Sequence, residues 1–196
     1  MAFCIVARQN MKIIGGNAKG TLLFSPNGRN TRPTLGRVRE SIFNVLANVG
    51  ILETNVLDIF AGTGAMGLEA LSRGAGQAVF IDKATAAVIR ENALRCHVGD
   101  RVKIFRGDVS SSLKALKGNH FDYIFMDPPY RKGYINEILK LVLDLELPAD
   151  DAVIIVEHSI SEPPDLTIFG GKLGLWKEKK LGAIVVSYLQ YRQTGV

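Results

Sequence analysis

The segment MDPPYRKG, residues 126–133, places two prolines between a carboxylate and an aromatic ring. Pro128 and Pro129 donate no backbone hydrogen bonds and stiffen the loop, so it offers mainly acceptors. The Asp127 carboxylate and the Pro128 carbonyl suit an amino group with two hydrogens to donate. If both hydrogens of that amino group are donated to these acceptors, the nitrogen lone pair leaves conjugation and can attack a methyl group. Asp127 or a water could then take the released proton. Tyr130 supplies a ring on which an extruded base can stack. A plain turn, in which Asp127 caps and Tyr130 packs, is the alternative.

A glycine-rich stretch, DIFAGTGAMG, follows an apolar run earlier in the chain. Gly62, Gly64 and Gly67 fit the G-x-G-x-x-G pattern of a strand-to-helix turn, where glycines let a ligand approach the backbone. Asp82 ends the next apolar run, 18 residues after Gly64, where a carboxylate can accept both hydroxyls of a ribose. Alone, this pattern predicts an ordinary nucleotide site, which NAD would fit.

Two further acids change that interpretation. Asp58 precedes the glycines and would repel the pyrophosphate of a dinucleotide, but it would attract a cationic ligand with a free amino group. S-adenosylmethionine is such a ligand, with Asp58 near its methionine part, Asp82 on the ribose and Asp108 near the adenine amino group. Asp108 also fits a helix N-cap, and the two roles are compatible. With their neighbours in the chain, the expected cofactor-binding residues are Asp58, Phe60, Ala61, Gly62, Thr63, Gly64, Asp82, Lys83, Asp108, Val109 and Asp127.

A mostly parallel, doubly wound α/β sheet must position these residues, because apolar runs of strand length alternate with segments of helical periodicity. Strands are expected at residues 55–60, 77–82, 101–105, 121–127 and 151–157, followed by an antiparallel pair at 173–180 and 183–191. Helices are expected at residues 38–49, 65–74, 84–96, 111–116 and 136–147. A small hairpin is expected within residues 11–24. In an open parallel sheet, ligands bind beyond the carboxyl ends of the strands, where Asp127 and the glycine loop would meet.

Length and composition predict one domain. The chain has 196 residues, of which 47% are hydrophobic, enough for a single core. Residues 11–196 are expected to form it, with a basic hairpin and helix in 11–50 and a cofactor-binding core in 51–196; residues 1–10 are expected to be a disordered arm or an upstream-start artefact. No apolar run approaches the roughly 20 residues of a membrane helix, so we expect a cytoplasmic protein. The three histidines are scattered and expected at the surface or in loops, and no metal site is predicted.

The charge is uneven along the chain. Residues 1–50 carry seven basic side chains and one acid, and the remainder carries 17 basic and 18 acidic groups, so the net +5 divides into +6 and −1. Clustered Lys and Arg favour a polyanion such as nucleic acid. A solvated basic edge is equally compatible with charge alone.

Four stretches together carry a family resemblance. DPPY, preceded by LDIFAGTGAMGLEALSRGA, resembles the class I methyltransferases that modify exocyclic amino groups. IIGGNAKG and TRPTLGRVRESIFNVL, nearer the front, resemble the bacterial small-subunit rRNA guanine-N2 methyltransferases of the RsmD type. The resemblance spans nearly the whole chain from Met11.

The resemblance implies an activity and a fold. It implies methyl transfer from S-adenosylmethionine to the N2 amino group of guanine 966 of 16S rRNA, in the small ribosomal subunit or its precursor. It also implies a seven-stranded sheet with a reversed last strand, and we expect a monomer. Asp127, Pro128, Pro129 and Tyr130 are then the catalytic residues.

The expected substrate-binding residues lie in the N-terminal part of the chain and are Arg32, Thr34, Arg37 and Arg39. Tyr130, in the loop of residues 126–133, is also expected to bind the substrate. The family pattern R-P-T-T-D-R-V-R-E is matched here except at Leu35 and Gly36, which replace Thr and Asp and raise the local positive charge. The arginines are interpreted as contacts to rRNA or to a cofactor lid. A solvated helix face is the alternative.

Two other functions remain open. An adenine-N6 methyltransferase acting on DNA or RNA shares DPPY chemistry, but the DNA enzymes usually need a target-recognition region, for which this chain has no segment. Guanine presents both N1–H and N2–H donors, which suit Asp127. A binding module or NAD enzyme would use the glycine loop alone, and Asp58 and the acceptor-only loop argue against it.

Overall fold

The computed structural model describes residues 11–25, 33–129 and 133–192, and for residues 33–35 it describes only the backbone. The expectations for residues 1–10, Arg32 and Tyr130 therefore lie outside the described residues. The side chain of Thr34 does so as well.

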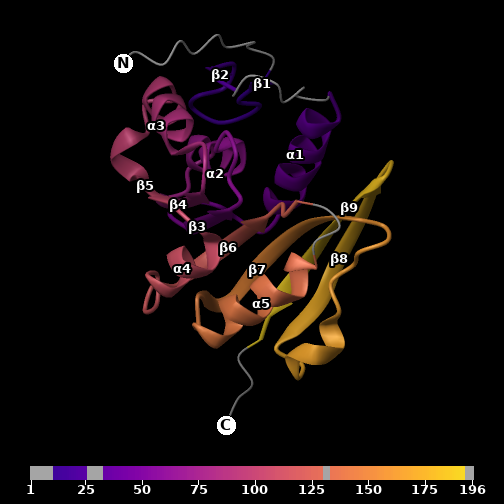
Figure 1. The fold of residues 1–196 in the computed structure, drawn as a ribbon. Helices are drawn as coiled ribbons and strands as arrows, with labels where there is room; N and C mark the ends of the chain where they lie inside the picture. The colour runs from indigo at the N-terminus through magenta and orange to yellow at the C-terminus, as the bar shows by residue number, and fades with distance from the viewer. Residues whose placement is uncertain (1–10, 26–32, 130–132, 193–196) are drawn as a thin grey trace.

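Seven strands of the described chain form one sheet, in the order β5-β4-β3-β6-β7-β9-β8 (Figure 1). Adjacent strands from β5 to β7 run parallel, and β9 runs antiparallel to both of its neighbours. The strands are β3 (Asn55–Ile59), β4 (Gln77–Asp82), β5 (Val102–Arg106), β6 (Phe121–Met126), β7 (Pro148–Ser159), β8 (Leu173–Leu181) and β9 (Ile184–Tyr191). The predicted doubly wound sheet with a reversed last strand is confirmed.

Helices cover both faces of the sheet, because successive side chains of a buried strand point to opposite sides. Tyr123 and Phe125 of β6 join the core under α1 (Pro33–Leu46), α2 (Ala65–Ser72) and α3 (Ala86–Arg95). Ile124 and Met126 join the core under α4 (Val109–Lys114) and α5 (Tyr134–Asp144). Short 3₁₀ turns lie at Gly99–Arg101 and Leu166–Phe169. No helix of the described residues is long and apolar enough to cross a membrane.

The N-terminal hairpin, β1 (Met11–Lys12) and β2 (Leu22–Leu23), is attached to the main domain through a buried acid. The carboxylate of Glu69 on α2 accepts hydrogen bonds from the backbone N–H groups of Ile14 and Gly15, both at 2.8 Å. The same carboxylate pairs with Arg73 at 2.8 Å and with Arg39 at 3.4 Å. The predicted hairpin is thus confirmed, and its backbone is hydrogen-bonded to helix α2.

Several element bounds differ from the sequence-based expectations, the first helix among them, and so does the place of one histidine. The first helix, expected at 38–49, begins at Pro33 and ends at Leu46, leaving Val49 half exposed beyond it. Proline is favoured in the first turn of a helix, where its missing N–H has no partner to lose. His158, expected at the surface or in a loop, is buried in β7, where its Nε2 lies 2.9 Å from the Ser187 hydroxyl of β9.

Candidate active site

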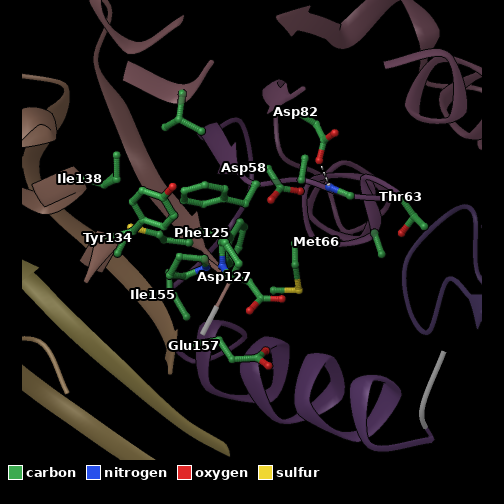
Figure 2. A pocket seen from close by; sticks show the side chains of 18 of the residues that line it. Asp58, Thr63, Met66, Asp82, Phe125, Asp127, Tyr134, Ile138, Ile155 and Glu157 are labelled. Atoms are coloured by element: carbon green, nitrogen blue, oxygen red, sulfur yellow. Dashed lines mark hydrogen bonds between the residues drawn. The ribbon is translucent and has the colours of Figure 1, made fainter. Parts of the chain in front are cut away.

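A pocket of about 1220 Å³ lies beyond the carboxyl ends of β3, β4, β6 and β7. The first helix and the β8–β9 turn, residues 181–184, complete its wall. Figure 2 shows that the side chains of Asp58, Asp127 and Glu157 point into this pocket. It is larger than the 300–1,000 Å³ of a typical small-molecule site, which leaves room for two ligands.

The glycine loop has the backbone shape that its sequence predicts. Gly62 and Gly64 have φ angles of 56° and 77°, in the left-handed region that favours glycine. A Cβ on Gly67 would lie 2.4 Å from the ring of Phe80 on β4, so helix α2 can approach the sheet only with glycine there. Phe60 also has a positive φ, 62°, which is strained for a bulky residue and typical of functional sites.

Asp58 lies at the base of the pocket and is buried. Its Oδ2 accepts a hydrogen bond of 3.0 Å from the Gly67 N–H. Burial raises the pKa of Asp58 to about 7; the hydrogen bond from Gly67 opposes this shift and the charge of Asp82 adds to it. A cation in the pocket would therefore be attracted most strongly above pH 7, where this carboxylate is ionised.

Asp82 ends β4 and holds two loops together. One oxygen accepts the Gly62 N–H at 2.9 Å, and the other accepts the N–H groups of Ala84 and Thr85 at 2.7 and 2.9 Å. Burial alone would raise the pKa of Asp82, but the hydrogen bonds from Ala84, Thr85 and Gly62 lower it overall. The carboxylate is thus kept ionised at the pocket edge. Its contact with a ribose stays a prediction.

Asp108 caps helix α4, where its side chain accepts the Ser111 N–H at 3.2 Å. It also lines the pocket, together with Val109 and Ser110. The capping role is confirmed, and the carboxylate remains exposed enough to approach a ligand.

The loop that contains Asp127 continues β6, directly beside the glycine-loop strand β3. Asp127, Pro128 and Pro129 all line the pocket, as expected of the catalytic residues. The rings of Phe60 and Tyr134 lie 6.1 Å apart on the same wall. The structure therefore brings the expected amino-group acceptors and the expected cofactor site into one space.

Nearly all of the expected cofactor-binding residues line this pocket; Gly64 alone is absent from the lining. Gly64 is buried in the loop, and a Cβ there would contact Ile89 at 3.1 Å, so its role is to shape the backbone. The others are Asp58, Phe60, Ala61, Gly62, Thr63, Asp82, Lys83, Asp108, Val109 and Asp127.

The expected substrate-binding arginines divide into two kinds. Arg37 is exposed on α1 and stays a candidate for RNA contact. Arg39 is only 4% exposed, pairs with Glu69, and donates to the Lys12 carbonyl, and burial lowers its pKa. Its guanidinium thus joins the hairpin to α2, which the alternative of a solvated helix face does not describe. Because Arg39 also lines the pocket, its contact with rRNA or a cofactor lid stays a prediction.

Glu157 lines the pocket and was missed by the sequence-based prediction. A usable signal existed, because Asp82 and Asp127 each end an apolar strand segment, and Glu157 ends the segment DAVIIVE in the same way. Tyr134 and residues 181–184 gave no such signal, since only the tertiary structure brings them to the pocket.

The strand order, the reversed β9 and the glycine loop beneath an acid-lined pocket define the class I methyltransferase fold. The chain belongs to the family described as Conserved hypothetical protein 95, whose model matches residues 11–190.

Relatives of known name agree over most of the chain. "Ribosomal RNA small subunit methyltransferase D" of Escherichia coli K12 is 36% identical over 187 residues, covering 94% of this chain and 92% of that protein. The protein of the same name from Haemophilus influenzae is 32% identical, covering 95% of each chain. A solved structure described as "Putative methyltransferase yhhF from Escherichia coli" superposes with a TM-score of 0.81 at 35% identity, covering 94% of this chain and 99% of that one.

Proposed function

We propose that this protein transfers a methyl group from S-adenosylmethionine to the N2 amino group of a guanine in 16S rRNA, guanine 966 by resemblance. The observation that carries the proposal is one pocket holding both Asp127-Pro128-Pro129 and the acids Asp58 and Asp82. The relatives named as small-subunit rRNA methyltransferases support the substrate class.

The residues of the pocket fit S-adenosylmethionine better than a dinucleotide. Asp58 lies where a pyrophosphate would be repelled and an ammonium or sulfonium group attracted. Asp82 would hold the ribose, and Asp108 with Val109 would face the adenine. When bound, the cofactor supplies an electrophilic methyl group.

Asp127 and the Pro128 carbonyl orient the target amino group. Each accepts one of its hydrogens, which draws the lone pair out of conjugation and directs it toward the methyl group. Positive charge then develops on the nitrogen, close to an acceptor that stabilises it. Asp127, or a water beside it, takes the released proton. Because Pro128 and Pro129 restrict the backbone, this geometry is set before the substrate arrives.

The basic front of the chain would bind the rRNA backbone. Arg37 on α1 is exposed, and α1 also contributes Val38 and Ile42 to the pocket, so a contact there adjoins the site of transfer. We propose that the protein acts as a monomer in the cytoplasm, on the small subunit or its precursor.

Methyl-labelled S-adenosylmethionine, incubated with small subunits, naked 16S rRNA or duplex DNA, tests this function. We expect label in the rRNA, located at one guanine by nuclease digestion and mass spectrometry as N2-methylguanosine. Label found only in DNA, or as N6-methyladenine, would instead support the adenine-N6 alternative.

The variant Asp127→Ala tests the catalytic assignment. We expect transfer to fall by at least about 10²-fold, from the usual cost of removing one preorganised stabilising group. Binding of S-adenosylhomocysteine, measured by calorimetry, should survive at least partly. Full transfer activity in Asp127→Ala would contradict the role.

A further inference from the structure

The pocket contains a second carboxylate beside Asp127, that of Glu157 near the carboxyl end of the neighbouring strand β7. Strands β6 and β7 pair in parallel with Phe125 opposite Ile155 and Met126 opposite Val156. Continuing this register by one residue places Asp127 opposite Glu157, on strands about 4.8 Å apart. Figure 2 shows both carboxylates directed into the same pocket.

The two carboxylates differ in depth. Glu157 is 9% exposed, whereas Asp127 is exposed at the pocket mouth. Side chains alternate along β7, so Glu157 points to the same face as Ile155, the face that α1 covers. Val38 and Ile42 of α1 line the same space with apolar surface. Glu157 thus offers a buried acceptor in the pocket that Val38 and Ile42 also line.

Guanine and adenine differ at the atom that would meet this acceptor. In guanine the atom beside the N2 amino group is N1, which carries a hydrogen; the other neighbour, N3, lies toward the sugar. When Asp127 and Pro128 hold N2, the sugar must point to the open mouth, so N1 points inward toward Glu157. A carboxylate accepts from the N1–H of guanine and repels the bare N1 of adenine or of an analogue without that hydrogen.

We propose that Glu157 is the residue that selects guanine, by accepting a hydrogen bond from its N1–H. This inference rests on the proposed function and reassigns N1–H from Asp127, which keeps the N2 amino group. The contact also strengthens during transfer, because positive charge on N2 makes the adjacent N1–H more acidic. Glu157 therefore contributes both to choice of base and to rate.

The test compares guanine with 2-aminopurine, which has the same N2 amino group but no N1–H. Small subunits are assembled from 16S rRNA carrying either base at the target position, and single-turnover methylation is measured with wild type and Glu157→Gln. Wild type should prefer guanine. In Glu157→Gln this preference should fall by about 10- to 100-fold, the range expected from losing one charge-assisted hydrogen bond. The side-chain amide of Gln can donate a hydrogen bond to the unprotonated N1 of 2-aminopurine. This further reduces the difference in methylation rate between the two bases.

Glu137→Gln is the matched control, because Glu137 lines the same pocket from α5 but is exposed. Its guanine preference should equal that of wild type. Glu157→Asp keeps the charge on a shorter side chain and should retain the preference at a lower rate, which covers the case in which Glu157→Gln does not fold. Calorimetry with S-adenosylhomocysteine verifies the fold of each variant.

An equal rate on both bases in wild type, or an unchanged preference in Glu157→Gln, overturns the role of Glu157 while leaving the methyltransferase assignment intact. Absence of any guanine methylation by wild type would instead refute the proposed function, and the selectivity inference with it.

Discussion

At the scale of single residues, Asp58 has opposite effects on stability and on ligand binding. Its pKa is about 7 in the folded protein and 3.8 in a free side chain. Between these values the folded protein retains a proton that the unfolded chain releases, so the free energy of unfolding falls as pH rises from about 4 to 7. Ionised Asp58 destabilises the ligand-free protein but attracts a cationic ligand.

Asp58→Asn should therefore raise the melting temperature at pH 8 by a few °C, since about 1 kcal/mol shifts it by 2–4 °C in a chain of this size. The gain should shrink at pH 5. Affinity for S-adenosylhomocysteine should fall at pH 8, and in wild type it should weaken as pH drops below 7. Melting curves and calorimetry at both pH values measure these effects, and a pH-independent affinity in wild type would contradict the assignment.

Residues of the candidate site were predictable where the local sequence alone indicates their position, as for a carboxylate that follows an apolar strand segment. Asp58, Asp82 and Asp127 lie at or next to the carboxyl ends of apolar strands, and parallel strands bring such ends together. The burial of Arg39 was not predictable, because its partner Glu69 is 30 residues away in the chain and only the fold reveals their contact. Glu157 was within reach of the same strand-end pattern.

At the scale of elements, Glu69 decides whether the hairpin stays attached. Glu69→Ala removes the acceptor of Ile14 and Gly15 and leaves Arg39 buried without its carboxylate. Breaking a buried ion pair costs about 3–5 kcal/mol. We expect a loss of that size in denaturant unfolding, together with faster hydrogen exchange at Ile14 and Gly15.

Glu91→Ala is the matched control, since Glu91 also pairs with an arginine four residues later, Arg95, but at the surface. The free energy of unfolding should change by less than about 0.5 kcal/mol. An equal loss of unfolding free energy in both variants would contradict the role of Glu69 in attaching the hairpin.

Substitution by alanine should change the free energy of unfolding in opposite directions at two helical glycines. Gly67→Ala forces a Cβ against Phe80 and should cost about 1–3 kcal/mol by overpacking. Gly36→Ala enters open space in α1 and should gain about 0.5–1 kcal/mol from helix propensity. Urea unfolding of both variants measures the difference, and stabilisation by Gly67→Ala would refute the close approach of α2 to β4.

The elements themselves followed from hydrophobic patterning, with most strand bounds predicted to within one or two residues. The start of α1 was missed because its first turn, Pro33 to Gly36, carries no apolar periodicity. Its end was missed because Val49 continues the periodicity beyond Leu46 without packing. Periodicity reports burial, and capping geometry decides where a helix begins and ends.

At the scale of the whole molecule, acids line the pocket while basic charge is concentrated in the front of the chain. Arg37→Ala should weaken rRNA binding and reduce the slope of log affinity against log salt by about 1, as expected for one lost phosphate contact. Lys117→Ala is the control, because exposed Lys117 precedes the amino end of β6, whereas the pocket lies beyond the carboxyl ends of the strands. An unchanged slope in Arg37→Ala would leave this arginine as ordinary surface charge.

The position of β9 between β7 and β8 has a consequence for synthesis of the chain. Strand β8 is translated before β9, yet all of its ladder partners are in β9. A growing chain therefore displays β8 as an unpaired strand until β9 leaves the ribosome, and pairing then also places residues 181–184 on the pocket wall. The glycine loop and Asp127 are therefore synthesised well before residues 181–184, which line the same pocket.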